Sequence, residues 1–318
     1  LYLCQPGGVP NQLWLRQANG SAIEAGAAAQ LDVLDASSSA LFLDLDGDGD
    51  RDLALASGSS LDIFARTSDG YVNVRRFSRA GITGLAAADV DMDGLLDLYV
   101  CAYAGPYSGG ALPVPYHDAE NGEANMLLMN RTRARDALGF RNELGSRGLR
   151  AGATRFSFAA AFADVDLDGD PDLYVANDFG RNALYVNDGT GRFEERAEAS
   201  GVVDTAAGMG ACFADLDQNG SPDLYVSNME SSAGRRITGA VAFRPAMNSE
   251  LGAIFKRHAK GNSLFLGRGD GTFDSTTLAE AGRWAWGSIP VDLDGNGALD
   301  LFVPNGFVSG SDGERPDL

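Results

Sequence analysis

Five short segments of the chain carry aspartates at a spacing that suits cation binding. Each nine-residue segment has Asp at positions one, three and nine, Asp or Asn at position five, and Gly at position six. Alternate side chains on such a tight loop can point three oxygens at one spot, and a position-seven carbonyl and the position-nine carboxylate can add two more. No segment contains His or Cys, and all-oxygen coordination at a flexible site favours Ca²⁺ over Mg²⁺ and transition metals.

The pattern therefore predicts about five calcium ions. The predicted ligand positions, with position seven acting through its backbone carbonyl, are Asp44, Asp46, Asp48, Asp50 and Asp52; Asp89, Asp91, Asp93, Leu95 and Asp97; Asp164, Asp166, Asp168, Asp170 and Asp172; Asp215, Asp217, Asn219, Ser221 and Asp223; and Asp292, Asp294, Asn296, Ala298 and Asp300. Asn219 and Asn296 each remove one negative charge, so the last two loops should bind calcium more weakly. The loops leave no place for a reacting substrate, and no catalytic residue is predicted in them.

Two other structures could carry such segments, an EF-hand and an Asp-Gly turn without an ion. An EF-hand needs a bidentate Glu at position twelve and flanking helices. The equivalent residues here are Leu55, Val100, Val175, Val226 and Val303, and these apolar residues exclude an EF-hand. The segments could also be solvated Asp-Gly turns without an ion, but repulsion between clustered carboxylates opposes that arrangement.

The residues around each loop repeat as well and indicate how the loops are held. A strand of small residues such as 157–163 precedes the loop, an apolar strand such as 173–176 follows it, and an alternating segment such as 182–187 comes next. A Gly-containing turn at 188–192 then leads into a fourth strand, as in a β-hairpin. The 41 glycines support an all-β chain with many turns. Four-stranded units that repeat are typical of β-propeller blades, whose innermost strands need small side chains.

The repeats predict a single β-propeller domain over residues 1–318, with calcium-binding loops between strands one and two of each blade. The expected division is a partial blade at 1–38, blades at about 39–80, 81–155, 156–203 and 204–283, a partial blade at 284–306 and a tail at 307–318. Because both end units are partial, we expect an excerpt of a six- or seven-bladed propeller whose signal sequence lies outside this chain. Insertions are expected between strands two and three, at about 104–124 and 229–261.

The loops and strands together resemble FG-GAP/VCBS repeats, which occur in the heads of integrin α-subunits. The segments Asp172-Leu-Tyr-Val-Ala-Asn-Asp178, Gly208-Met-Gly210 and Trp284-Ala-Trp-Gly287 resemble the cartilage-acidic-protein type, which is associated with an ASPIC/UnbV domain. This chain lacks the ASPIC/UnbV segment, and the integrin-like Phe-Gly to Gly-Ala-Pro signature is not legible. The resemblance implies a secreted or surface calcium-binding propeller and names no particular ligand.

Composition restricts the partners. The chain has 44 acidic and 25 basic residues, a net charge of −19, which disfavours nucleic acid because phosphate binding depends on Lys and Arg. Eighteen of the acidic residues are aspartates at side-chain ligand positions, so the rest of the chain is nearly neutral. No apolar run approaches the roughly 20 residues of a membrane-spanning helix. A calcium-rich compartment suits such loops, so an extracellular, cell-surface or periplasmic location is expected.

Basic residues gather in two segments that could bind a partner. Residues 131–155 contain seven Arg, and 229–261 contain a predicted helix at 248–260. Arg133 and Arg135 with Arg235 and Arg236 are the candidates for an anionic glycan or acidic partner, and Tyr116 and His117 are further candidate ligand-binding residues. The alternative is that these charges only offset an acidic scaffold. His258, near the end of the predicted helix, is expected to face solvent.

The sequence favours a noncatalytic, extracytoplasmic, calcium-stabilised propeller that binds or adheres to a protein or glycan. The alternative is a calcium-dependent enzyme, a polysaccharide lyase or hydrolase, with its site on the face that carries the inserted loops. An acid, a base and an Arg or Tyr converging there would favour the enzyme, whereas a shallow basic or aromatic surface would favour binding.

Overall fold

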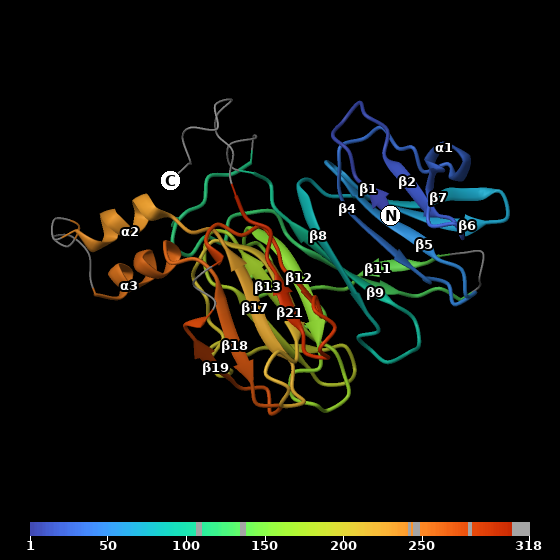
Figure 1. Ribbon diagram of the computed structural model, residues 1–318. Helices are drawn as coiled ribbons and strands as arrows, with labels where there is room; N and C mark the ends of the chain where they lie inside the picture. Colours follow the sequence, from blue (N-terminus) through green and yellow to red (C-terminus); the bar gives the residue numbers. More distant parts are fainter. Residues whose placement is uncertain (106–109, 134–137, 241–242, 244–248, 279–281, 307–318) are drawn as a thin grey trace, which may run out of the picture.

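The protein is built from a series of small antiparallel β-sheets (Figure 1). A computed structural model describes residues 1–318 except 106–109, 134–137, 241–242, 244–248, 279–281 and 307–318. Four of the described sheets have four strands, and each takes its strands from one continuous stretch of the chain. The prediction of an all-β chain made of repeated four-stranded units is therefore confirmed. The closed propeller stays a prediction.

The strands follow one another in chain order within each sheet. The first sheet contains β1 (Tyr2–Leu3), β2 (Gln12–Arg16) and β3 (Ala22–Glu24). The second contains β4 (Ser37–Leu43), β5 (Asp52–Ser57), β6 (Ser60–Thr67) and β7 (Gly70–Ser78). The third contains β8 (Ile82–Ala88), β9 (Asp97–Ala102), β10 (Met126–Asn130) and β11 (Phe140–Asn142).

The later sheets repeat this order. The fourth contains β12 (Ser157–Ala163), β13 (Asp172–Asn177), β14 (Ala183–Asn187) and β15 (Phe193–Glu195). The fifth contains β16 (Gly208–Ala214), β17 (Asp223–Asn228), β18 (Ser263–Gly267) and β19 (Phe273–Thr276). The last described pair is β20 (Ile289–Val291) with β21 (Asp300–Phe302). The helices are α1 (Gly26–Ala29), α2 (Ser232–Gly239) and α3 (Ser249–His258).

Hydrophobic packing joins each sheet to the next. All residues of β5, β9, β13 and β17 are buried, because apolar side chains on both faces of these strands contact a neighbouring sheet. One cluster joins Tyr99 and Leu127 of the third sheet to Leu173 and Tyr185 of the fourth. Burial of such large side chains contributes about 1.5–3 kcal/mol each, so the interfaces between sheets hold the fold together.

Small residues let the first strands of successive sheets lie close together. β4 contacts β8, β8 contacts β12, and β12 contacts β16. A Cβ added at Gly84 would lie 2.9 Å from the carbonyl oxygen of Phe158, and one at Gly210 would lie 3.0 Å from the Cα of Gly287. The first distance is too short for a side chain and the second is very tight, which explains the Gly and Ala bias of these strands.

The two long insertions lie where the sequence places them, between the second and third strands of a sheet. One connects β9 to β10, and the other connects β17 to β18 and contains α2 and α3, which pack side by side at one end of the molecule (Figure 1). α3 confirms the predicted helix, while α2 was not predicted. Ser231 begins α2 by accepting the backbone N–H of Gly234 on its hydroxyl at 2.9 Å, a helix-capping bond. None of the helices in the described ranges is long and apolar enough to cross a membrane.

In the third, fourth and fifth sheets, a buried asparagine fastens the end of the second strand to the start of the third. In the fourth sheet, the Asn182 side-chain oxygen accepts the backbone N–H of Asn177 at 2.7 Å, and its amide donates to the Tyr174 hydroxyl at 3.1 Å. The same pair of bonds recurs at Asn125 with Tyr99. Asn182 is only 3% exposed, so water cannot replace the hydrogen bonds that it makes.

We therefore predict that Asn182→Ala destabilises the protein by about 2–4 kcal/mol, because the buried Asn177 N–H loses its acceptor and the Tyr174 hydroxyl loses one of its two hydrogen bonds. The measurement is chemical or thermal unfolding at fixed calcium concentration. Arg192→Ala, at an exposed position on a nearby turn, is the control and should change the free energy of unfolding by less than about 0.5 kcal/mol. Equal stability of the two variants would contradict this role for Asn182.

Candidate metal loops and a pocket between the insertions

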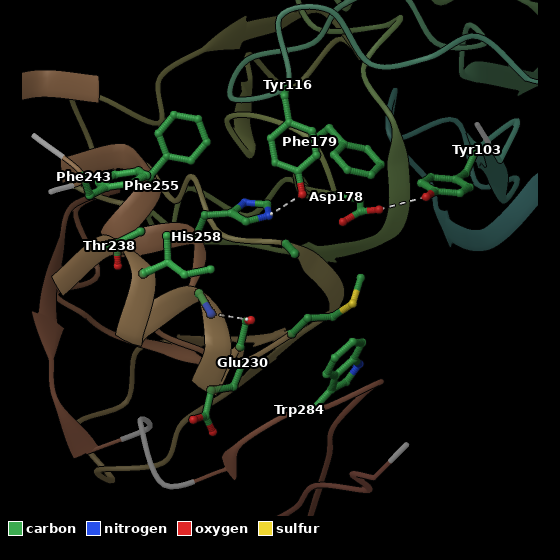
Figure 2. Close-up of a pocket in the computed structure, with 15 residues that line it drawn as sticks. Tyr103, Tyr116, Asp178, Phe179, Glu230, Thr238, Phe243, Phe255, His258 and Trp284 are labelled. Atoms are coloured by element: carbon green, nitrogen blue, oxygen red, sulfur yellow. Dashed lines mark hydrogen bonds between the residues drawn. The ribbon is translucent and has the colours of Figure 1, made fainter. Parts of the chain in front are cut away.

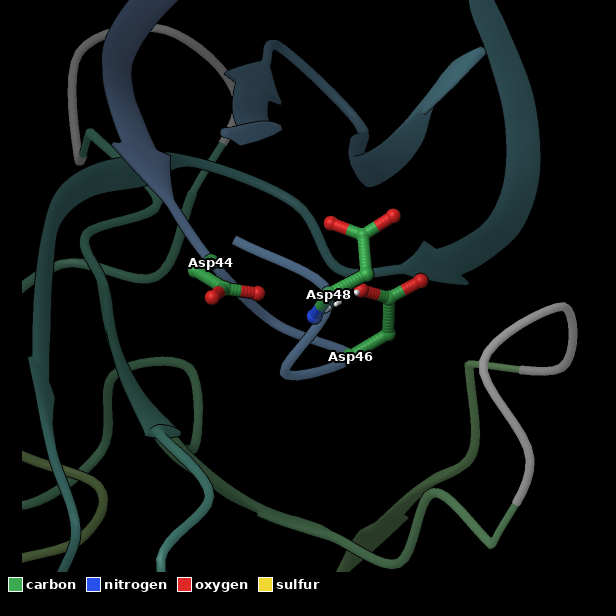
Figure 3. A group of neighbouring side chains, drawn as sticks. All are labelled: Asp44, Asp46 and Asp48. Atoms are coloured by element: carbon green, nitrogen blue, oxygen red, sulfur yellow. Dashed lines mark hydrogen bonds between the residues drawn. The ribbon is translucent and has the colours of Figure 1, made fainter. Parts of the chain in front are cut away.

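The five acidic segments form loops at equivalent places, each joining the first strand of a sheet to the second. In every loop, three carboxylates each offer an oxygen within 4.8 Å of the others. The groups are Asp44, Asp46 and Asp48; Asp89, Asp91 and Asp97; Asp164, Asp166 and Asp172; Asp215, Asp217 and Asp223; and Asp292, Asp294 and Asp300. Figure 3 shows the first group on its loop. The structure thus brings predicted ligand residues together in all five loops.

The position-one aspartate shapes the loop. In the third loop, the two carboxylate oxygens of Asp164 accept the backbone N–H groups of Asp168 at 3.1 Å and Gly169 at 2.9 Å. Gly169 has a φ of 100°, a left-handed conformation that glycine adopts without strain. The glycine at position six is therefore a requirement of the turn itself.

The position-nine aspartate has a second role that the sequence pattern did not indicate. Asp172 accepts the backbone N–H of Val165 in its own loop at 2.9 Å and that of Asn187, at the end of the third strand, at 2.8 Å. Asp52, Asp97 and Asp223 make the equivalent two bonds in their sheets. This residue therefore fastens the acidic loop to the third strand, and Asp97, Asp172 and Asp223 also belong to the carboxylate groups of their loops.

Burial and mutual repulsion disfavour the charged form of several loop carboxylates. Burial raises the pKa of Asp97 and of Asp172 to about 7, despite the backbone hydrogen bonds that oppose the shift. Burial, followed by repulsion from Asp168 and Asp166, raises the pKa of Asp170 to about 6. These shifts indicate concentrated negative charge that a cation would stabilise.

Unused oxygen atoms support the same interpretation. One carboxylate oxygen each of Asp91, Asp166 and Asp170 is buried and has no hydrogen-bond partner in the described part of the chain. Buried acceptors are normally satisfied, and carboxylate oxygens are ligands that calcium prefers. The donor sets of the second and third loops thus fit a calcium ion. Asp170 was expected to act only through its carbonyl, but its buried carboxylate also belongs to this group of charges.

Arginines from the predicted basic segment lie beside the second loop. Arg131 and Arg147 approach the same oxygen of Asp91 at 3.0 and 3.2 Å, and both also pair with Glu143. Arg155, further along, pairs with acids of the first insertion. Part of the basic segment therefore neutralises the protein's own acids.

The candidate residues for an anionic partner lie at two different ends of the sheets. Arg133 is exposed and follows β10, at the end that carries the acidic loops. Arg235 and Arg236 lie on exposed positions of α2, at the opposite end, and Arg235 pairs with the buried Glu230. Arg135 lies outside the described residues. Each half of the predicted basic surface would therefore have to bind on its own.

Tyr116 and His117, in the first insertion, pack against the second insertion. The Tyr116 ring stacks on Phe255 of α3, with centroids 6.4 Å apart and an interplanar angle of 10°, and the His117 ring lies 6.1 Å from the same phenylalanine. The Tyr116 hydroxyl is 3.4 Å from Nε2 of His258. His258 was expected to face solvent, and this was wrong, because the two insertions pack against each other and leave it only partly exposed.

A cavity of about 620 Å³ lies between the insertions (Figure 2). We call it the insertion pocket. Its walls include Tyr103, Tyr116, Asp178, Phe179, Phe255 and His258, with parts of α2 and Trp284. Asp178 follows β13 and accepts a hydrogen bond from the Tyr103 hydroxyl at 2.8 Å. These residues are far apart in the sequence, and no sequence motif predicts that they line one pocket.

Comparison with known proteins identifies the repeats. The FG-GAP-like repeat pattern matches residues 44–100, 164–226 and 253–303, just over half of the chain. The chain belongs to the FG-GAP-like repeat family. This confirms the resemblance drawn from the acidic loops and the strands that flank them.

Cartilage acidic protein 1 is a relative of this FG-GAP-like repeat protein. The Xenopus tropicalis protein is 26% identical over 275 residues, covering 74% of this chain and 40% of the relative. The human protein is 25% identical over 274 residues with the same coverage. The chain thus matches about two fifths of the length of these relatives.

Two solved structures also resemble this FG-GAP-like repeat chain. A lectin of Agrocybe aegerita that recognises non-reducing terminal N-acetylglucosamine is 14% identical, has a TM-score of 0.38, and aligns over 93% of this chain and 82% of its own. The V. cholerae biofilm matrix protein Bap1 is 13% identical, has a TM-score of 0.42, and aligns over 86% of this chain and 34% of its own. Likenesses at this level carry no argument about what this chain binds.

We predict that Asp172→Ala lowers stability by about 2–4 kcal/mol even in chelator, because two buried backbone N–H groups lose their acceptor. Unfolding in urea with excess chelator measures the effect. Asp50→Ala is the control, because Asp50 is exposed and lies in the equivalent loop of another sheet. If Asp172→Ala unfolds at the wild-type urea concentration in chelator, the carboxylate has no structural role beyond metal binding.

Proposed function

We propose that this chain is a noncatalytic, calcium-stabilised β-propeller segment, with the blade boundaries predicted above, that binds a protein or glycan outside the cytoplasm. The observation that carries the proposal is the recurrence of one carboxylate group in five equivalent loops. Membership in the FG-GAP-like repeat family supports it. The relatives named for cartilage support an extracellular location.

Calcium would act at the junction of three strands. Each acidic loop joins the first two strands of its sheet, and in four sheets the position-nine aspartate also binds the third strand. An ion held by positions one, three and nine would offset the repulsion among these carboxylates and stiffen the junction. FG-GAP-like loops used in this way stabilise a scaffold, and the scaffold then presents its insertions to a partner.

The proposal predicts that calcium raises the melting temperature of chelator-treated protein. Binding to the folded state stabilises it by about 2.7 kcal/mol per site when calcium is a hundredfold above its Kd. Differential scanning calorimetry in excess chelator, followed by calcium addition, measures the change. The same titration with Mg²⁺ should give a smaller shift. An unchanged melt, together with no bound metal by elemental analysis, would overturn the proposal.

Asp166→Asn separates calcium binding from loop folding. Because one Asp166 oxygen is buried without a hydrogen bond and burial raises the pKa of this carboxyl, the variant should be as stable as wild type, or more stable, in chelator. With calcium it should gain less than wild type, by about 1–3 kcal/mol. Glu194→Gln removes one charge at an exposed position nearby and should respond to calcium like wild type. An Asp166→Asn variant with the full calcium response would contradict a ligand role for Asp166.

The predicted affinity for anionic glycans rests on two separate exposed arginines. We expect Arg133→Glu and Arg236→Glu each to elute earlier from a sulfated-glycan column, and their effects to add, because the residues lie at opposite ends of the sheets. Arg192→Glu, at another exposed position, is the charge-matched control. If both folded variants are retained as strongly as the control, the insertions and hairpins do not bind sulfated glycans through these residues.

The alternative, a calcium-dependent polysaccharide lyase or hydrolase, has one observation on its side. The insertion pocket contains a carboxylate, an imidazole and two tyrosines. They form two separate pairs, Tyr103 with Asp178 and Tyr116 with His258. The surrounding walls are largely apolar and contain no Arg or Lys among the described residues, whereas acidic polysaccharides require basic groups. Binding therefore remains the favoured function.

A further inference from the structure

We propose that the insertion pocket binds an organic cation, a protonated amine carried on an apolar body. This goes beyond the proposed calcium-stabilised scaffold, because it assigns a ligand class to a site that contains no calcium loop. The volume of about 620 Å³ lies within the range of cavities that enclose small organic ligands. Three features of the lining define the ligand: aromatic walls, a buried carboxylate, and no Arg or Lys among the lining residues that the structure describes.

Aromatic rings form much of the wall. The Tyr116 ring lies edge-on to Phe179 with centroids 5.1 Å apart and stacks on Phe255, and Tyr103 stacks on Phe179 at 6.4 Å. Figure 2 shows these rings around one open space. Ring faces attract a cation that lies within about 6 Å, and they also offer apolar surface to the rest of the molecule. The wall thus suits a ligand with both a positive charge and a hydrophobic body.

Asp178 supplies the negative charge. Asp178 is 3% exposed, yet it lines the pocket. Among the described residues, its side chain accepts one hydrogen bond, from the Tyr103 hydroxyl. No Arg, Lys or His in the described part of the chain forms an ion pair with it. Burial raises the pKa of Asp178 to about 6, so the group still carries a charge at pH 7.5. A charged N–H donor would satisfy its remaining acceptor capacity.

The other ionisable groups of the lining do not favour an anion. Glu230 is already paired with Arg235, and its carboxylate points away from the open space in Figure 2. Burial lowers the pKa of His258, and its two ring nitrogens face the carbonyl of Thr205 and the hydroxyl of Tyr116, both at 3.4 Å. This arrangement suits a neutral ring that donates from Nδ1. A carboxylate or sulfate ligand would therefore meet no positive partner in the described lining.

A neutral sugar also fits less well. The hydroxyl groups contributed by α2 and its cap are engaged in local bonds: Ser231 accepts from Gly234, and Thr238 lies 3.3 Å from the carbonyl of Arg235. Asp178 supplies a carboxylate on one side of the pocket. A ligand with one charged polar end matches this asymmetry, whereas a sugar needs polar partners around its ring.

Tryptamine and two analogues that differ in charge test the proposal. Tryptamine is a cation at pH 7.5, tryptophol is neutral, and indole-3-propionate is an anion, while all three carry the same indole. Calorimetric or NMR titration of the calcium-loaded chain should show tryptamine binding at least about tenfold tighter than tryptophol, the factor of one charge-assisted contact. Indole-3-propionate should not bind. Equal binding of tryptamine and tryptophol, or no binding of tryptamine, would overturn the proposal.

The Asp178→Asn variant tests whether tryptamine binds in the insertion pocket. The amide can keep a hydrogen bond with Tyr103 but removes the charge, so tryptamine affinity should fall at least about tenfold and tryptophol affinity should stay the same. The melting temperature should be unchanged or higher, because a buried charge is gone. Glu194→Gln, far along the fourth sheet and exposed, should bind tryptamine like wild type. Unchanged tryptamine affinity in Asp178→Asn would overturn the site.

Tyr116→Leu is the second variant, in case Asp178→Asn does not fold. Tyr116 is 44% exposed, so its replacement should not prevent folding. Leucine keeps an apolar wall but removes one aromatic face. Tryptamine affinity should fall about threefold or more, in line with the loss of a cation–π contact, with a smaller change for tryptophol. Equal losses for both probes would mean that the ring supplies only apolar surface, and the cation assignment would fail.

Discussion

One buried aspartate at the start of the second strand is the contact on which the four-stranded sheets depend. In four sheets its two oxygens accept one N–H from the acidic loop and one from the end of the third strand. The carboxylate must be close to both segments, so it fixes the loop and the strand in one geometry. Because burial raises the pKa of Asp97 and Asp172 to about 7, this geometry carries an electrostatic cost. A cation in the loop would reduce that cost.

The acidic loops and the long insertions lie at opposite ends of the sheets, so the candidate metal ligands are separated from the insertion pocket. The loop end is constrained by glycine conformation, backbone hydrogen bonds and clustered charge. The opposite end accepts insertions because a longer connection between strands two and three leaves the strand pairing intact. Two such insertions meet through Tyr116, Phe255 and His258. A chamber with aromatic walls results, built on strands that the loop end holds in place.

Several basic side chains form ion pairs with the protein's own acidic loops and insertions. Arg131 and Arg147 pair with the second acidic loop, and Arg155 pairs with acids of the first insertion. A basic run in the sequence therefore becomes in part internal compensation once the chain folds. Arg133 and Arg236 remain exposed, but at different ends of the sheets. Local charge density in a sequence is a weak guide to a surface, because pairing partners come from distant segments.

The order of strands, the position of the acidic loops and the location of both insertions could all be predicted, since each depends on short-range patterns that repeat along the chain. The α3 helix was likewise visible from its periodicity and its end residues. α2 was missed, because its eight residues are short and its Ser231 cap is a common residue. The position-nine aspartate was recognised as a candidate ligand, but its bonds to the third strand depend on strand pairing that a sequence pattern does not display.

By itself, the sequence determined the repeat, the all-β class and the candidate ligands of each acidic loop, because these depend on residues within a few positions of one another. Only the tertiary structure decided which arginines are paired, that His258 packs against Tyr116, and that Asp178 shares a pocket with both. The Tyr116 and His258 side chains meet across 142 residues of sequence. Such a contact follows from the packing of whole sheets, whose burial energy, and not any local preference, brings the two insertions together.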